Sequence, residues 1–122
     1  MPGKLAMHFV PAHYKAMLES HLELLADPAQ QLEYQRNVPI AHVAAELFEG
    51  WEDHYMACRD TDLSHFMTAA QAQVLREFDA ELDSILRSMP PPRIPTLDEF
   101  MQTEPWGRLV AAAKVALDKF RA

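Results

Sequence analysis

Apolar residues recur every three or four positions over most of the chain, and this is the spacing of one face of an α-helix. The first such repeat predicts a helix over 12–26, with Leu18, Leu22 and Leu25 on its buried side. Asp27 followed by Pro28 is typical of a helix start, because aspartate caps free amides and proline suits the first turn. A second, shorter helix is therefore predicted over 28–36.

A third helix is predicted over 40–58, where Val43, Leu47 and Trp51 lie four residues apart. This stripe assigns Trp51 to the core, and the alternative is an exposed Trp51 at an interface. Gly50 lies inside the same pattern and costs about 1 kcal/mol relative to alanine. We interpret this glycine as a sign that another helix packs close to it.

Capping boxes, in which a threonine and a residue three positions later satisfy each other's amides, predict two further helix starts. They are Thr68-Ala69-Ala70-Gln71, followed by an apolar stripe up to Met89, and Thr96-Leu97-Asp98-Glu99. Pro90-Pro91-Pro92 ends the first of these helices, since proline cannot donate the backbone hydrogen bond. A last helix is predicted over 105–120.

These elements predict an all-α fold, an irregular or orthogonal bundle with four main helices and one or two short ones. The length of 122 residues corresponds to one domain, 1–122. We expect residues 1–10 to form an extended or disordered arm and residues 90–104 to form a proline-rich connection.

Composition excludes several classes of protein. Three scattered glycines leave no glycine-rich loop to hold a phosphate. Cys58 is the single cysteine, so neither an intramolecular disulfide nor a cysteine-based zinc site is expected. We expect Cys58 to be a small buried apolar residue, and we expect no cofactor. No apolar segment is long enough to span a membrane, and the first ten residues do not resemble a signal peptide. A cytoplasmic location is therefore predicted.

The net charge of −7 is concentrated in the middle of the chain. Residues 41–89 contain ten acidic and three basic side chains, whereas the segments on either side are close to neutral. This distribution argues against nucleic acid as a partner, because nucleic acid requires clustered Lys and Arg. A field gathered on one region attracts a basic partner at long range.

The candidate binding residues come from the third predicted helix and the loop after it. Glu46, Glu49 and Asp53 fall at positions i, i+3 and i+7, so they share one helix face. The complete predicted binding set is Glu46, Glu49, Glu52, Asp53, Tyr55, Asp60 and Asp62. A second acidic run on the next helix contains Glu77, Asp79, Glu81 and Asp83. The alternative interpretation is a solvated acidic face that serves solubility.

A metal site is the other chemistry considered. His42 and Glu46 are four residues apart, and Glu49 and His54 follow about one turn later. A two-carboxylate site with histidine can be assembled from these four residues, although the Glu-x-x-His motif of di-iron bundles is absent. The main alternative is that these histidines are solvated or hydrogen-bonded surface residues.

Two stretches of the chain resemble a pattern found in small bacterial helical proteins. They are LEYQRNVP at 32–39 and ELFEGWEDHY at 46–55. The later Phe66-x-x-Ala69-x-x-x-x-Val74-Leu75-x-x-Phe78 and Trp106-x-x-Leu109-Val110 are similar too, so the resemblance covers 32–118. Some of those proteins resemble immunity proteins encoded beside secreted or contact-delivered toxins. The resemblance implies a cytoplasmic binding role without catalytic residues, and many such toxins are basic nucleases.

The leading hypothesis is therefore a non-enzymatic, acidic helical protein that binds a basic protein, in the manner of an immunity protein. One alternative is a secretion or assembly chaperone, which would need a methionine-rich or aromatic groove for an unfolded segment. The other alternative is a metal-dependent helical enzyme that uses His42, Glu46, Glu49 and His54. The oligomeric state is left open.

Overall fold

The computed structural model describes residues 11–59, 67–89 and 95–122, in which all regular structure is helical. The helices are α2 (Pro11–Ala26), α3 (Pro28–Asn37), α4 (Val43–Arg59), α5 (Ala69–Ser88), α6 (Leu97–Phe100) and α7 (Glu104–Arg121). The four long helices and two short ones confirm the predicted all-α class.

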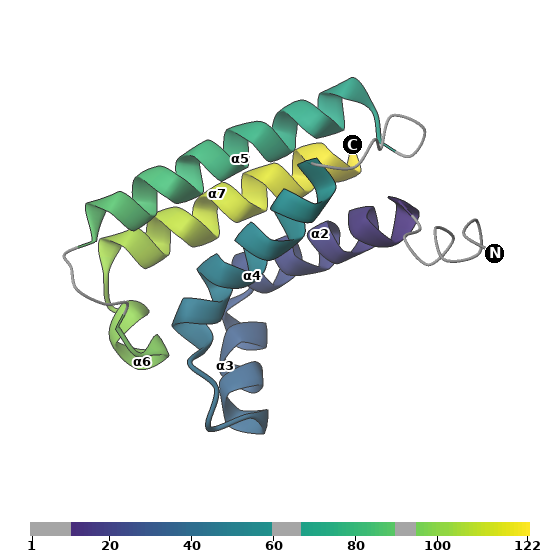
Figure 1. Ribbon diagram of the computed structural model, residues 1–122. Coiled ribbons are helices and arrows are strands. Elements are labelled where there is room, and N and C mark those ends of the chain that lie inside the picture. Colours follow the sequence, from purple (N-terminus) through teal and green to yellow (C-terminus); the bar gives the residue numbers. More distant parts are fainter. Residues whose placement is uncertain (1–10, 60–66, 90–94) are drawn as a thin grey trace.

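Among the four long helices, α7 and α2 make the most extensive contacts with the others. Helix α7 lies beside α5 along its whole length and also contacts α2, which in turn packs against α4 (Figure 1). The short helix α3 runs across the direction of α5 and α7 and contacts both α2 and α4. This arrangement brings α2, α3 and α4 together on one part of the surface.

Helix starts follow the predicted capping residues. Asp27 accepts from the amides of Ala29 and Gln30, and Thr68 and Gln71 form a complete capping box. Thr96 forms a second box with Glu99, and Thr103 accepts from the amide of Trp106. These local side-chain bonds explain why the starts of α3, α5 and α6 were predictable.

The start of α4 was predicted wrongly. The helix was expected from Ile40 but begins at Val43, and Ile40 is 97% exposed. The Gln35 side chain donates to the carbonyl oxygen of Ala41 at 2.7 Å, and the amide of Ala41 bonds to Val38. The chain therefore makes a turn here, and Ile40 points into solvent.

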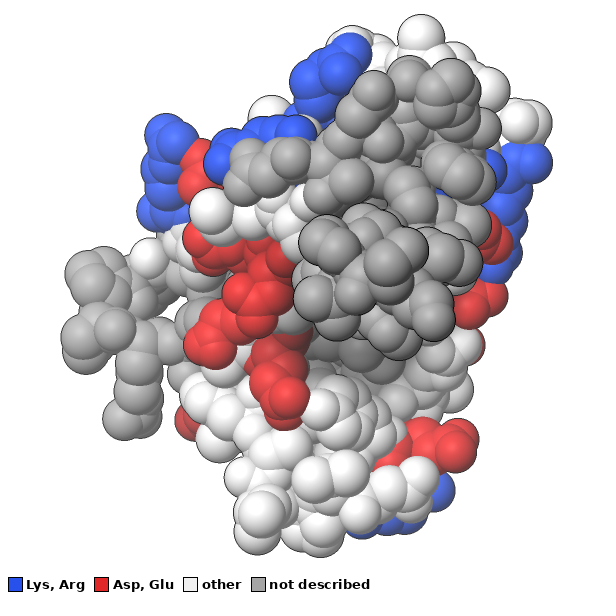
Figure 2. All heavy atoms as spheres, turned by 45° about the vertical axis from the view of Figure 1, so that its right-hand side comes forward, with Lys and Arg blue, Asp and Glu red and all other residues white. Residues whose placement is uncertain are grey.

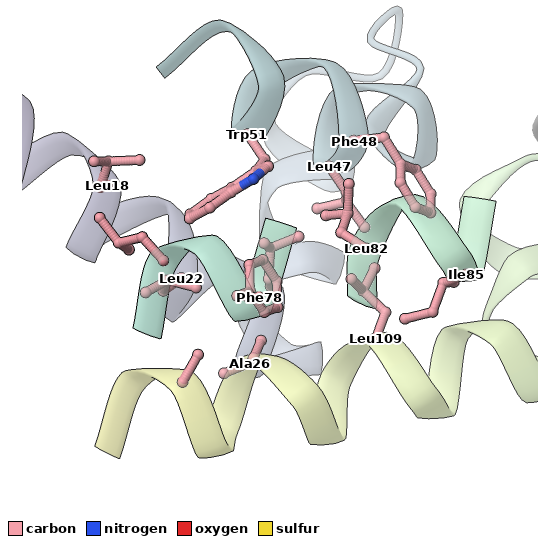
Figure 3. Close-up of a cluster of buried hydrophobic side chains, with 14 of the residues drawn as sticks. Leu18, Leu22, Ala26, Leu47, Phe48, Trp51, Phe78, Leu82, Ile85 and Leu109 are labelled. Carbon is pink, nitrogen blue, oxygen red and sulfur yellow. The ribbon is translucent and has the colours of Figure 1, made fainter. Parts of the chain in front are cut away.

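The core is built from apolar side chains of α2, α4, α5 and α7 (Figure 3). Trp51 is fully buried, as predicted, and its ring meets the edge of Phe78 at a centroid distance of 4.8 Å. Leu18 and Leu22 approach from α2, and Leu109 approaches from α7. The core thus fixes the inner side of α4 and leaves its opposite side to solvent.

One buried polar side chain holds α3 in place. Gln31 is fully buried, and its amide nitrogen donates to the carbonyl oxygens of Leu24 and Leu25 at 3.1 Å each. Its amide oxygen accepts from Nε1 of Trp106 at 3.0 Å. Gln31 therefore satisfies the end of α2 and ties α3 to the start of α7.

Several expectations fall on residues that the structure does not describe. They are the arm at 1–10, the helix-ending prolines 90–92, and the carboxylates Asp60 and Asp62. Among the described helices, none combines the length and the apolar character needed to cross a bilayer.

Candidate functional site

Three carboxylates form the outer surface of α4. Glu49, Glu52 and Asp53 are exposed, because they lie on the side of the helix away from the buried Leu47 and Trp51. No ion pair joins any of the three to another residue within 11–59, 67–89 and 95–122. We call Glu49, Glu52 and Asp53 the α4 carboxylate face.

On the face shown in Figure 2, a band of acidic side chains lies near the middle, other acidic side chains lie toward the right and lower edges, and basic side chains lie at the margins. Like charges at this spacing repel one another by a few tenths of a kcal/mol per pair. A positive group placed over the α4 carboxylate face would relieve that repulsion.

Glu46 shares the outer side of α4 but is engaged by α3. The Tyr34 hydroxyl donates to Oε1 of Glu46 at 2.7 Å. This hydrogen bond to the carboxylate, together with burial, raises the pKa of Tyr34. Glu46 therefore helps to join α3 to α4, while its negative charge still adds to the local field.

Tyr55 lies on a different side of α4 from the carboxylate face. It follows Asp53 by two residues, which is about 200° around the helix axis. The Tyr55 ring stacks on Trp51 with a centroid distance of 5.6 Å and an interplanar angle of 12°. Burial, followed by the charge of Asp79, raises the pKa of Tyr55. Tyr55 thus belongs to the α4–α5 contact rather than to the surface around Glu49.

The carboxylates of α5 are bound by the protein's own side chains. Asp79 accepts from Nε1 of Trp51 at 3.1 Å, and Glu81 forms an ion pair with Arg108 of α7 at 2.8 Å. The other two are bonded within α5 itself: Asp83 pairs with Arg87, and Glu77 accepts from Gln73. Asp79 and Glu81 therefore join α5 to α4 and α7, whereas Glu77 and Asp83 lie on the outer surface of α5 with partners on their own helix.

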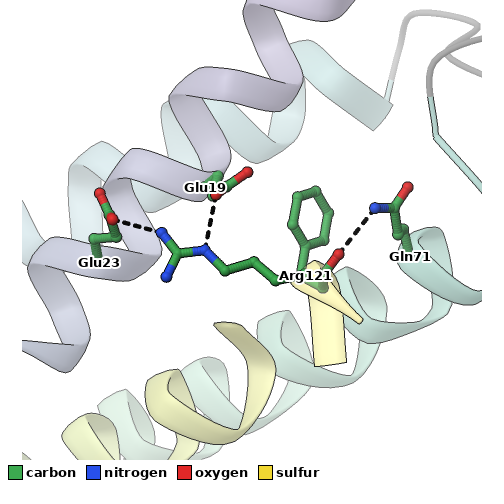
Figure 4. Close-up of polar contacts among 5 residues, drawn as sticks. Glu19, Glu23, Gln71 and Arg121 are labelled. Atoms are coloured by element: carbon green, nitrogen blue, oxygen red, sulfur yellow. Dashed lines mark hydrogen bonds and ion pairs between the residues drawn. The ribbon is translucent and has the colours of Figure 1, made fainter. Parts of the chain in front are cut away.

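The acidic residues of α2 are also paired. Arg121, at the end of α7, reaches Glu19 with Nε and Glu23 with Nη2 (Figure 4). Beside it, the Gln71 amide donates to the carbonyl oxygen of Phe120 at 2.9 Å. These bonds close the C-terminal end of the bundle against α2 and α5.

Three of the four metal candidates have separate partners, and the fourth, Glu49, is an exposed member of the α4 carboxylate face. His42 Nε2 donates to the carbonyl oxygen of Pro95 at 3.0 Å, and Glu46 binds Tyr34. His54 lies edge-on to His21, with ring centroids 5.6 Å apart. Across the part of the chain that the structure describes, no group of three or more His, Cys, Asp or Glu side chains is placed to hold a metal ion.

A hollow of about 550 Å³ lies between α2, α3 and α4. Its wall consists of Met17, Ser20, His21, Leu24, Gln30, Glu33, Tyr34, Asn37 and His54. Sequence reasoning missed this site, since its residues come from three helices and follow no spacing rule. We call it the α2–α3–α4 hollow.

Gly50 is the residue that allows His21 to reach the hollow. A Cβ atom at Gly50 would lie 2.6 Å from Cε1 of His21, so α2 approaches α4 closely, as predicted. His21 Nε2 donates to the carbonyl oxygen of Leu47 at 2.9 Å. Burial lowers the pKa of His21, which favours the neutral ring. Gly50 was thus the one signal in the sequence for this site.

Two other expectations concern Cys58 and the groove between α5 and α7. Cys58 is buried, and burial raises the pKa of its thiol, which agrees with the predicted apolar role. A groove of about 400 Å³ between α5 and α7 is lined by alanines and valines together with Glu77, Glu81, Arg108 and Lys119, and of its described lining residues Phe78 alone is aromatic and none is methionine. This lining differs from the methionine-rich or aromatic groove expected of the chaperone alternative.

No model of a known protein family, no curated protein and no solved structure matches the chain.

Proposed function

We propose that this chain is a protein-binding domain that uses the α4 carboxylate face to bind a basic protein. The observation that supports the proposal is the contrast between helices. The carboxylates of α5 and α2 are engaged by the chain's own side chains, whereas Glu49, Glu52 and Asp53 are exposed and form no ion pair within the described residues.

The physical basis is electrostatic. Exposed carboxylates on a rigid helix attract a basic surface and increase the rate of association. Because the inner side of α4 is fixed by Leu47 and Trp51 in the core, the helix backbone that carries the carboxylates is ordered before the partner binds. Binding therefore needs little ordering of the backbone, which favours affinity.

The finer proposal is that the protein acts as an immunity protein and covers a basic toxin. Its support is the resemblance of residues 32–118 to bacterial proteins of this type, together with the net charge of −7. An immunity protein needs a surface that blocks its target, and it needs no catalytic group.

The test compares two double charge reversals. The wild-type chain, immobilised, is used to isolate a partner from the cells that produce it, and the partner is then identified and purified. We expect Glu49→Lys with Asp53→Lys to weaken binding by about 100-fold or more, since like charges juxtaposed at an interface cost several kcal/mol. Isothermal titration calorimetry at several salt concentrations measures the affinity.

The matched control is Glu77→Lys with Asp118→Lys, which changes the net charge equally at exposed positions of α5 and α7. We expect this control to bind within about threefold of wild type, because distant exposed charges are screened. Circular dichroism verifies that both variants fold. Equal losses in the two variants, or an affinity independent of salt, would contradict the proposed docking face.

A further inference from the structure

The α2–α3–α4 hollow lies directly beside the proposed docking face. His54 lines the hollow and follows Asp53 in the chain, and Tyr34 lines it while donating to Glu46 of α4. His54 lies about 100° around the α4 axis from Asp53, so a partner reaches the hollow when it extends from the α4 carboxylate face toward α3. Its volume of about 550 Å³ lies within the usual range for ligand sites.

The charged side chains at the hollow favour a cation as its ligand. Glu33 is the only Asp, Glu, Lys or Arg among the described residues that line it, and the Glu46 carboxylate accepts from the hydroxyl of Tyr34, which also lines the hollow. His21 adds no positive charge when neutral, since its Nε2 donates to the carbonyl oxygen of Leu47 and burial disfavours its protonated form. An anion would be repelled by Glu33, and among the described lining residues only the imidazole rings of His21 and His54 could offset this repulsion, with no Lys or Arg present.

The types of residue that line the hollow suit a long side chain that ends in a flat cation. Met17 and Leu24 offer apolar surface to a hydrocarbon stem. Tyr34 offers an aromatic face, and Glu33 and Asn37 offer oxygen acceptors. A guanidinium group stacks on aromatic rings and bonds a carboxylate with two N–H groups, which an ammonium group cannot do.

We propose that the α2–α3–α4 hollow receives an arginine side chain of the partner, with the guanidinium group at Glu33 and Tyr34. This inference rests on the proposed function, because it assigns an anchor residue to the same partner. Arginine is among the residues that contribute most to binding energy at protein interfaces, especially when a pocket excludes water around it.

The probe is the peptide acetyl-Gly-Arg-Gly-amide, and its control is the same peptide with citrulline, the neutral isostere of arginine. The full chain carries ¹⁵N labels and ¹³C-labelled methionine methyl groups, and Met17→Leu identifies the signal of Met17. We expect the arginine peptide to shift the signals of Met17 and the His54 ring in a saturable manner. Citrulline should bind at least about tenfold more weakly, because it lacks the charge-assisted hydrogen bond.

Two matched variants test the position of the site. Ser20 lines the hollow, and Ser84 is an exposed serine in the last two turns of α5. Ser20→Arg places a guanidinium group in the hollow and should abolish the shift of Met17, whereas Ser84→Arg adds the same charge elsewhere and should preserve it. Glu33→Gln should weaken the arginine peptide by about two- to fivefold.

The possible results separate this inference from the proposed function. Equal binding of the citrulline peptide, or equal losses in Ser20→Arg and Ser84→Arg, would overturn the arginine site. Shifts confined to the amides of Glu49, Glu52 and Asp53 would also overturn it, while the docking face would stand. If neither peptide binds and the α4 charge reversals leave partner affinity unchanged, both proposals fail.

Discussion

Helices α4 and α5 both present runs of carboxylates, but the two runs have opposite relations to the rest of the molecule. On α5, Asp79 accepts from the buried Trp51 and Glu81 pairs with Arg108. On α4, Glu49, Glu52 and Asp53 face solvent and form no ion pair within the described residues. Similar stretches of sequence thus serve packing in one helix and surface potential in the other.

The difference shows that a count of charges does not identify a docking face. What separates Asp79 and Glu81 from the α4 carboxylate face is that a donor from another helix reaches each of these two carboxylates. Helix α5 lies between α4 and α7 and meets Trp51 on one side and Arg108 on the other. The α4 carboxylate face lies on the side of α4 that points away from the core, so its charge is available to another molecule.

Equal substitutions on the two helices should therefore have unequal effects on stability. Asp79→Ala leaves the indole N–H of the fully buried Trp51 without its acceptor, and an unsatisfied buried donor costs about 1 to 3 kcal/mol. Asp53→Ala removes an exposed side chain and should leave the free energy of unfolding within about 0.5 kcal/mol of wild type. Urea denaturation measures both, and equal losses would contradict the comparison.

The pH dependence of stability should include a contribution from His21, which belongs to neither carboxylate run. Burial lowers the pKa of His21 below its ordinary value of 6.5, so its contribution to stability is present above pH 6.5 and is lost as pH falls toward the folded-state pKa. The loss is at most about 1.4 kcal/mol per pH unit.

His21→Gln should flatten the stability curve between pH 7.5 and pH 5.5, whereas His13→Gln, at an exposed position of the same helix, should not. Urea denaturation at several pH values provides the measurement. Identical slopes in the two variants would assign the whole effect to carboxylates instead.

The side of α4 that faces α2 should respond to a single methyl group. Gly50→Ala gains about 1 kcal/mol of helix propensity, but the new Cβ would lie 2.6 Å from the His21 ring, which is held by its bond to Leu47. We expect a net loss of about 1 kcal/mol, because overpacking costs about 1 to 3 kcal/mol.

In a His21→Ala background the same substitution should stabilise the protein by about 1 kcal/mol. Thermal and urea unfolding of the four variants completes the cycle. Additive effects would mean that His21 does not pack against Gly50.

The smallest effect is expected on the α4 carboxylate face itself. Glu49→Gln with Asp53→Asn removes repulsion between like charges and should raise the free energy of unfolding by a few tenths of a kcal/mol. The gain should shrink as salt increases, since salt screens exposed charges. A clear loss of stability in low salt would show that these carboxylates have a structural role.

Most of the fold could be predicted from local signals. Asp27, Thr68 and Thr96 mark helix starts through bonds to amides two or three residues away, and the spacing of Leu47 and Trp51 assigns the buried side of α4. The start of α4 could not be predicted, because the Gln35 bond to Ala41 forms only once α3 has folded beside it.

The candidate site was less predictable, because its properties depend on distant partners. Tyr55 was grouped with the carboxylates by nearness in sequence, but it stacks on Trp51 toward α5. Nothing near Glu81 indicates that Arg108 will pair with it. The pair of His21 and His54 is likewise assembled by tertiary packing, and Gly50 was its only trace in the sequence.

The solvent-facing side of α4 has a consequence for how this protein can diversify. Its outward carboxylates make no contribution to the core that Trp51 anchors on the other side of the same helix. Sister sequences that differ only at positions 49, 52 and 53 would share one architecture and present different potentials. Recognition could then drift from one target to another by point substitution, without an accompanying change in the folded body.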